Sequence, residues 1–112
     1  MEQNLVVYSD GEIELEIAIE EESIWLLTED IATIFGVQRP AVVKHIGNIY
    51  KDGELLQNPT CSILEQVTKD GKKRKVNYYN LDMVISVGYK VNSKKATLFR
   101  QWATSVLNII LF

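Results

Sequence analysis

The hydrophobic pattern of the chain changes its period at Thr28, and this change constrains the fold more than any other feature of the sequence. Between Ile13 and Ile19, aliphatic residues alternate with glutamates, which is the period of a β-strand with one wet face. An Asp10-Gly11 pair separates this run from an earlier β-rich run and is typical of a hairpin turn. After Thr28, apolar residues recur at helical spacing. The sequence therefore predicts an α+β fold that opens with an N-terminal β-hairpin.

The glutamates of the alternating run are Glu14, Glu16 and Glu20. Their simplest role is to form the solvated face of the hairpin, and no function is needed to explain them. We also expect this acidic row to keep the edge of the sheet from pairing with other chains, because charged side chains protect exposed edges.

Two short helices are predicted after the hairpin. Thr28 is a suitable N-cap for the first, and the acidic residues that follow it suit the positive end of a helix. Gly36 ends this helix. The second begins at Gln38 or Arg39 and runs to about Tyr50, and a proline in its first turn is tolerated because the amides there have no helical acceptor.

A second hairpin and two C-terminal helices complete the predicted elements. Residues 61–80 indicate two strands joined at an Asp70-Gly71 turn. Asn80 can cap a helix that continues to about Val91, where an Asn-Ser pair ends it before the last helix begins at about Lys94. That last helix carries two adjoining apolar stripes, which comprise Leu98, Trp102, Val106 and Ile109, and Phe99, Ala103, Leu107 and Ile110.

Size and composition are those of one globular domain spanning residues 1–112. The chain has no internal repeat and no obvious interdomain linker, and 46% of its residues are hydrophobic. Cys61 is the only cysteine and His45 the only histidine, so we expect no internal disulfide, no metal site and no cofactor. No apolar stretch is long enough to span a bilayer, and we expect a cytoplasmic protein without a membrane partner.

Charge is segregated along the chain although the net charge is only −3. The first thirty residues contain ten acidic residues and no Lys or Arg, whereas all 12 Lys and Arg follow residue 38. Segregation of this kind indicates a basic working face. The alternative is that the acidic residues merely solvate exposed strands and pair with lysines across the surface.

The two short helices match the spacing of a helix-turn-helix, whose second helix, here about residues 38–50, lies in the DNA major groove. Val42, Ile46 and Ile49 give this helix an inward face, and His45 is expected to pack beside it. Arg39 is then free to reach phosphates or guanine edges. The residues predicted to face the DNA are Gln38, Arg39, Ala41, Val43, Lys44 and Asn48.

The second hairpin strengthens this interpretation. In winged-helix proteins a basic hairpin follows the recognition helix and lies along the DNA backbone or minor groove. The turn at residues 69–75 provides such a basic tip, with Lys69, Lys72, Lys73, Arg74 and Lys75. Phosphate contacts of this type give an affinity that falls steeply with salt. A solvated hairpin tip is the alternative.

The stretches "IWLLTEDIATIFGV", "KHIGNIYKDGEL" and "VNYYNLDMVISVGYKVNSKKATLFRQWATSVL" together resemble the RhuM family of bacterial virulence-associated proteins. The likeness is dense from about Ile24 to Leu107. The family is similar to N-terminal modules of phage antirepressors, so the resemblance implies DNA binding and a role as a transcriptional regulator or antirepressor of mobile-element or virulence type. Family members usually continue beyond the last helix, so the resemblance implies that this chain is either an N-terminal domain or a truncated relative.

The chain departs from the family at the start of the recognition helix. The family usually has a Ser-Arg-Ser-Thr-like segment there, whereas this chain has Gln38, Arg39, Pro40 and Ala41. The arginine carries over to Arg39, but the hydroxyl contacts to phosphate do not.

Two other classes of function compete with DNA binding. An enzyme is disfavoured, because there is no phosphate-binding glycine loop and one Cys with one His gives no convincing nucleophile-base pair. We therefore expect double-stranded DNA as the partner and no small-molecule substrate. The stronger rival is a protein-interaction module of antirepressor type, in which the C-terminal helix binds a repressor or forms a homodimer through its apolar end at Ile109 and Phe112.

Overall fold

The computed structural model describes residues 4–20 and 23–111, and the side chains of these residues as far as Val106. Five strands form one antiparallel sheet in the order β1-β2-β3-β5-β4. Their bounds are β1 (Asn4–Ser9), β2 (Glu14–Glu20), β3 (Ser23–Leu27), β4 (Cys61–Val67) and β5 (Lys73–Asn80).

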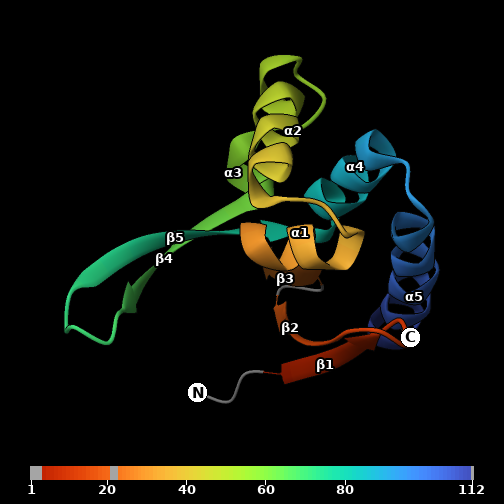
Figure 1. Cartoon of the computed structure of the whole chain (residues 1–112), viewed down its shortest axis with the longest axis horizontal. Coiled ribbons are helices and arrows are strands. Elements are labelled where there is room, and N and C mark those ends of the chain that lie inside the picture. The colour runs from red at the N-terminus through yellow and green to blue at the C-terminus, as the bar shows by residue number, and fades with distance from the viewer. Residues whose placement is uncertain (1–3, 21–22, 112) are drawn as a thin grey trace.

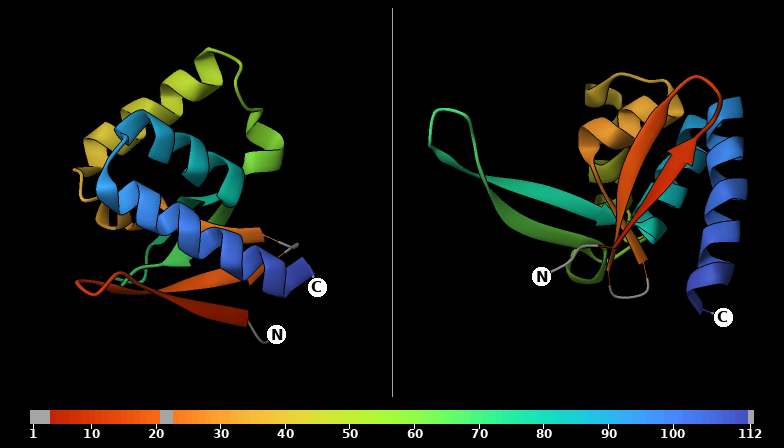
Figure 2. Two further views of the ribbon diagram at one scale, coloured as in Figure 1. Left: turned by 90° about the vertical axis from the view of Figure 1, so that its right-hand side faces the viewer. Right: turned by 90° about the horizontal axis from the view of Figure 1, so that it is seen from below.

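The helices cover one face of this sheet and leave the other face open (Figures 1 and 2). Their bounds are α1 (Thr28–Phe35), α2 (Arg39–Lys51), α3 (Gln57–Thr60), α4 (Leu81–Val91) and α5 (Lys94–Leu111). The hairpin of β4 and β5 projects beyond the helices, and we call it the wing (Figure 1). The fold is therefore α+β, as the change of hydrophobic period predicts.

Most predicted elements are confirmed, but one strand was not predicted. Both hairpins form at their Asp-Gly pairs, and Gly36 separates α1 from α2. The overlooked strand is β3, which pairs with β2 on one side and with β5 on the other. It is too short to show a clear period of two. Through β3 the two hairpins become parts of one sheet.

One short helix was not predicted, and one local prediction is wrong. Residues 57–60 form the single-turn helix α3, in which the Thr60 hydroxyl donates to the Leu56 carbonyl at 2.6 Å. Thr28 is not the cap of α1 but its first helical residue, and Leu27 occupies the cap position. There the Asp30 carboxylate accepts a hydrogen bond from the Leu27 amide at 3.4 Å.

The core lies between the covered face of the sheet and the helices, and it is centred on four aromatic rings. Tyr8 of β1 meets Phe99 and Trp102 of α5 edge-on, with centroids 5.3 Å and 5.0 Å apart, and Phe99 also meets Phe35 of α1 at 5.7 Å. Edge-to-face packing of this kind adds to the area buried. It fixes α5 and α1 against the first hairpin.

The last helix buries one of its two predicted stripes more fully than the other. Phe99 and Ala103 are buried, and so is Val106, but Leu98 is 43% exposed because it points away from the sheet. The side chains of Leu107, Ile109 and Ile110 lie outside the described residues, as does Phe112.

The acidic row on β2 is exposed, as predicted, but it does not lie on the edge of the sheet. Glu14, Glu16 and Glu20 all face solvent. The edge strand is β1, which carries no charged residue. The expectation that these glutamates protect the edge is therefore wrong, because they lie one strand inside it.

A partly buried ion pair fastens the turn of the first hairpin to α5. The Lys95 ammonium lies 3.4 Å from the Asp10 carboxylate, whose side chain is only 2% exposed, and 3.0 Å from that of Glu12. Backbone amides of Ile13 and Glu12 also donate to Asp10, at 3.0 Å and 2.9 Å. These hydrogen bonds from the backbone amides, and to a smaller degree Lys95, hold the pKa of Asp10 below its ordinary value.

The Tyr8 hydroxyl is buried and has no hydrogen-bond partner among the described residues. An unpaired buried hydroxyl costs desolvation free energy that nothing repays. We expect Tyr8→Phe to keep the aromatic packing and to raise the free energy of unfolding by about 1 kcal/mol, measured by urea denaturation. The matched variant Phe99→Ala should lose about 3–5 kcal/mol. A loss of stability in Tyr8→Phe would show that the hydroxyl does find a partner.

The ion pair of Asp10 predicts a dependence of stability on pH. Because the folded-state pKa of Asp10 is lowered, its ionised form stabilises the fold above the ordinary pKa of 3.8, and this contribution disappears as the pH falls through the folded-state value. Asp10→Asn should therefore be less stable than the wild type at pH 7, and the difference should vanish in acid. Thermal unfolding across pH measures it. The control Glu12→Gln alters an exposed carboxylate and should change little.

Candidate nucleic-acid interface

The turn between α1 and α2 is set by Gly36. Its φ of 68° lies in the left-handed region that suits glycine, and the following amide of Val37 donates to the Ala32 carbonyl at 3.0 Å. Gln38 then returns the chain to an extended conformation and precedes α2. Three residues thus separate α1 from α2, and the two helices pack against each other.

The inward face of α2 is the predicted one. Val42 and Ile49 are fully buried and Ile46 is 5% exposed, in a core that also includes residues of α1 and α4. His45 is half-buried beside them. Hydrophobic anchoring along one side therefore fixes which residues of α2 face solvent.

Five of the six α2 residues predicted to face DNA are exposed; these are Gln38, Arg39, Val43, Lys44 and Asn48. Ala41 is half-buried, so its prediction is only partly met. The exposed residues do not all point the same way. Lys44 follows Arg39 by five positions, which places it about 140° further round the helix.

Tyr79 lies at the base of the wing, buried on the helix side of β5, where its hydroxyl accepts a hydrogen bond from Asn77 at 3.4 Å. Burial raises the pKa of this hydroxyl, and the Asn77 hydrogen bond and, to a smaller degree, the positive charge of Arg39 oppose the rise. The direct contact between α2 and the base of the wing is made by Tyr50, whose hydroxyl lies 2.9 Å from that of Thr60, the residue before β4.

Strand alternation divides the basic residues of the wing between its two faces. Because side chains of a strand point alternately to either side, Lys73 and Lys75 share the face of Tyr79, whereas Arg74 points to the opposite face. All three are exposed. The helix side of the wing, on which Tyr79 is buried, therefore carries Lys73 and Lys75.

The tip of the wing is an ordered loop from Thr68 to Lys72. The Thr68 amide donates to the Lys72 carbonyl and the Gly71 amide to the Thr68 carbonyl, both at 2.9 Å. The Asp70 carboxylate accepts hydrogen bonds from the Thr68 hydroxyl and the Lys72 amide, and these bonds lower the pKa of Asp70. Asp70 thus holds the loop in shape while Lys69 and Lys72 remain exposed at its end.

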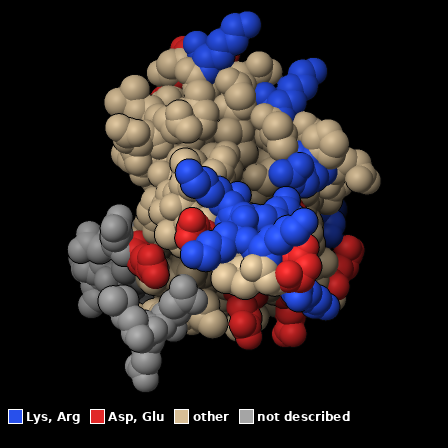
Figure 3. Space-filling model, turned by 90° about the vertical axis from the view of Figure 1, so that its left-hand side faces the viewer, with Lys and Arg blue, Asp and Glu red and all other residues tan. Residues whose placement is uncertain are grey.

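Basic side chains gather on the side of the molecule that carries the wing. Figure 3 looks onto the wing end-on and shows Lys and Arg over it, with more basic side chains above and acidic side chains along the lower border. Within the described residues, the ion pairs engage Lys90 and Lys95, and none engages a basic residue of α2 or of the wing. Their charge is thus available to a phosphate backbone.

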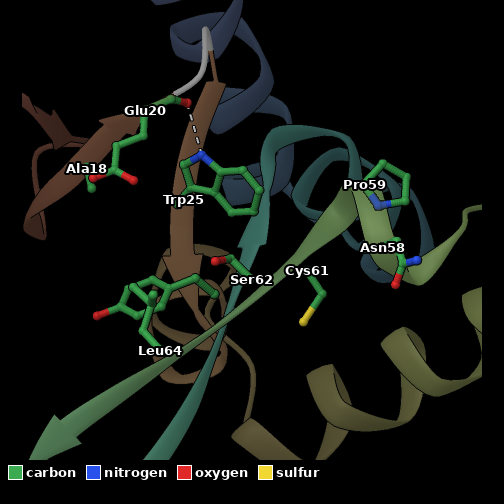
Figure 4. Close-up of a pocket in the computed structure, with 9 residues that line it drawn as sticks. Ala18, Glu20, Trp25, Asn58, Pro59, Cys61, Ser62 and Leu64 are labelled. Atoms are coloured by element: carbon green, nitrogen blue, oxygen red, sulfur yellow. Dashed lines mark hydrogen bonds between the residues drawn. The ribbon is translucent and has the colours of Figure 1, made fainter.

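A hollow of about 230 Å³ on the opposite, open face of the sheet was not predicted from the sequence (Figure 4). Trp25 forms part of its wall and donates its indole N–H to the Glu20 carbonyl at 3.0 Å. Tyr78, Cys61 and Pro59 also line it. The sequence signal that could have indicated this hollow is the position of Trp25 between Ile24 and Leu26, which are buried on the other face of the sheet.

The hollow differs in chemistry from the basic surface. Burial raises the pKa of the Cys61 thiol, which disfavours the reactive thiolate. Its lining residues include no Lys or Arg, so it is not a continuation of the basic surface. In the part of the chain that the structure describes, no three His, Cys, Asp or Glu side chains are placed to share a metal ion.

Comparison with known proteins finds a family match in the C-terminal half of the chain. Residues 59–111 match the Virulence protein RhuM family. The RhuM match covers 53 of the 112 residues and includes the wing, α4 and α5. It confirms the resemblance to this family, whereas the likeness expected from Ile24 to Asn58 is not covered by it. No curated protein and no solved structure matches the chain significantly.

None of the helices among the described residues has the length and apolar character needed to cross a bilayer.

Two glycines at this surface predict opposite effects of the same substitution. In Gly36→Ala the positive φ is strained, and the new Cβ would lie 2.9 Å from Cδ of Lys95, so we expect a loss of about 1–2 kcal/mol. Gly47 lies exposed within α2 with open space around it, so Gly47→Ala should gain about 0.5–1 kcal/mol. Urea denaturation of the two variants measures this. A stable Gly36→Ala would mean that the turn does not need a left-handed residue.

Proposed function

We propose that this chain is a DNA-binding module of the winged helix-turn-helix type. In this proposal α1 and α2 form the helix-turn-helix, α2 is the recognition helix in the major groove, and the wing contacts the backbone. The observation that carries it is that the basic residues of α2 and of the wing are exposed and take no part in the ion pairs of the described residues. On the helix side of β5 these residues are Lys73 and Lys75.

The dimensions of α2 suit a major groove. Thirteen residues give a helix about 20 Å long, and a groove about 12 Å wide admits a helix. The exposed N-terminal turn presents Gln38 and Arg39, which can pair bidentately with adenine and guanine respectively. Lys44 is exposed further along the helix, where it can contact phosphates on the walls of the groove.

The wing supplies contacts that do not depend on DNA sequence. Its basic residues are exposed and have no carboxylate partner among the described residues, so phosphates can approach them without breaking an existing pair. Each phosphate that is neutralised releases counterions, and the affinity should therefore fall with salt. The Asp70 carboxylate orders the loop and thereby reduces the entropy lost when phosphates bind.

The RhuM match indicates the biological setting, since the family is described as virulence proteins. A DNA-binding module in such a protein would serve as a transcriptional regulator or as part of an antirepressor. The match includes the wing but not α1 and α2, so recognition by α2 rests on its geometry.

A second candidate function is protein binding through α4 and α5. Tyr89 is 64% exposed, and the Arg100 guanidinium stacks over its ring at 4.4 Å from the centroid. Both residues line a shallow hollow between the two helices, and Leu98 is exposed nearby on α5. Exposed aromatic and arginine side chains of this kind are enriched at protein interfaces. A repressor or other protein partner would dock here without using the wing.

A matched pair of wing variants tests the DNA-binding proposal. Lys75→Ala and Arg74→Ala remove one charge each from neighbouring positions on opposite faces of β5. We expect Lys75→Ala and Arg39→Ala each to weaken binding to duplex DNA by about 1–2 kcal/mol, whereas Arg74→Ala should have a smaller effect. Fluorescence anisotropy at several salt concentrations measures both the affinity and the salt slope, and duplexes selected from a random pool supply the target.

Three results would count against the proposal. Equal losses in Arg74→Ala and Lys75→Ala would mean that the two faces of the wing do not differ. A selection that enriches no sequence would remove specific recognition by α2. A protein partner whose binding survives Arg39→Ala but is lost in Tyr89→Ala would favour the second candidate.

A further inference from the structure

β1 lies at the edge of the sheet opposite to the wing. The strand order β1-β2-β3-β5-β4 leaves its outer side without a partner strand among the described residues, and β1 forms the lower border of the molecule in the left view of Figure 2. Every second residue of an edge strand points its N–H and C=O groups outward, away from the sheet. These groups can receive another strand.

The sequence of β1 lacks the usual protection of an edge. Natural edge strands carry lysines, prolines or bulges that prevent pairing with other chains. β1 consists of Asn4, Leu5, Val6, Val7, Tyr8 and Ser9, with no charge and no proline. Two of its aliphatic side chains, Leu5 and Val7, are 50% and 55% exposed on the open face of the sheet. An edge of this kind favours pairing.

We propose that β1 pairs in antiparallel orientation with β1 of a second copy of this chain, which joins two five-stranded sheets into one of ten strands. A two-fold axis makes such an interface self-complementary and closed, because each strand presents the same groups to the other. This interface is distinct from the C-terminal helix that the sequence suggested for a homodimer.

Strand geometry fixes the register of this pairing. Residues directly opposite each other must lie on the same face of the continuous sheet, so their numbers have the same parity. The register that overlaps β1 most fully sets Val6 opposite the second copy's Val6, with Leu5 opposite the second copy's Val7. On the open face, Leu5 and Val7 then contact the same two residues of the second copy, and this contact partly buries their apolar surfaces.

Electrostatics also permits this pairing. The acidic rows of the two copies lie on β2, so they would be three strand spacings apart, at about 14 Å. This exceeds the screening length of about 8 Å at physiological ionic strength, and the repulsion is small. The wings lie at the two outer ends of the ten-stranded sheet, so the surfaces proposed to bind DNA remain free.

Cysteine cross-linking tests both the interface and its register. In a Cys61→Ser background, Val6→Cys should form a covalent dimer under mild oxidation, because directly opposite residues have Cα atoms about 4.5–5.5 Å apart, within disulfide range. The control Leu5→Cys in the same background meets its own copy only diagonally, at about 7–8 Å, and should cross-link much less. A higher yield at Leu5 than at Val6 would overturn the register.

Sedimentation analysis of the full chain tests whether the pairing occurs without a cross-link. The wild type should show a monomer–dimer equilibrium between micromolar and submillimolar concentrations, and the double variant Leu5→Lys, Val7→Lys should remain monomeric because it places lysines opposite one another. The control Leu98→Lys adds charge to an exposed apolar residue of α5 and should still dimerise. Circular dichroism checks that each variant is folded.

Three sedimentation results would overturn the proposal. The first is a wild type that stays monomeric throughout this range. The second is a dimer that is lost in Leu98→Lys but kept in the β1 double variant, which would place the interface on α5. The third is growth beyond the dimer, which would mean that β1 pairs with a different edge in an open-ended manner.

Discussion

The structure depends on the pairing between β3 and β5. Three residue pairs join them, with Leu26 opposite Tyr79 on the covered face. This pairing links the first hairpin to the wing across fifty residues of chain, and β5 then passes directly into α4, whose start is capped by the Asn80 side chain at 3.2 Å from the Met83 amide. Without it the two hairpins would be separate ribbons, and an isolated two-stranded ribbon is marginally stable.

The same pairing gives the candidate interface its shape. It fixes the base of the wing against the body of the molecule, where the Tyr50 hydroxyl of α2 lies 2.9 Å from that of Thr60, just before β4. The alternation of β5 then determines which lysines lie on the helix side of the wing and which basic residue faces away. The proposed DNA contacts are therefore divided more finely than the clustering of charge in the sequence suggests, with Lys73 and Lys75 separated from Arg74.

The two edges of the sheet differ in charge and in shape. The wing edge is basic, projects from the body and carries an ordered loop held by Asp70. The β1 edge is neutral and packs through Tyr8 against α5. A nucleic acid suits the first edge and a second copy of the neutral strand suits the other. The hollow at Trp25 lies on the open face between these edges and is used by neither proposal.

The sequence by itself determined the local elements and the exposure of α2. Short-range chemistry sets them: an Asp-Gly pair closes a hairpin, Gly36 ends α1, and the spacing of Val42, Ile46 and Ile49 selects the inward face. Only the tertiary structure decided that β3 exists, that the acidic row lies inside the edge, and that Lys73 and Lys75 lie on the helix side of the wing while Arg74 faces away. These features depend on which strands pair, and strand pairing is settled by contacts between residues far apart in sequence, which no local pattern encodes.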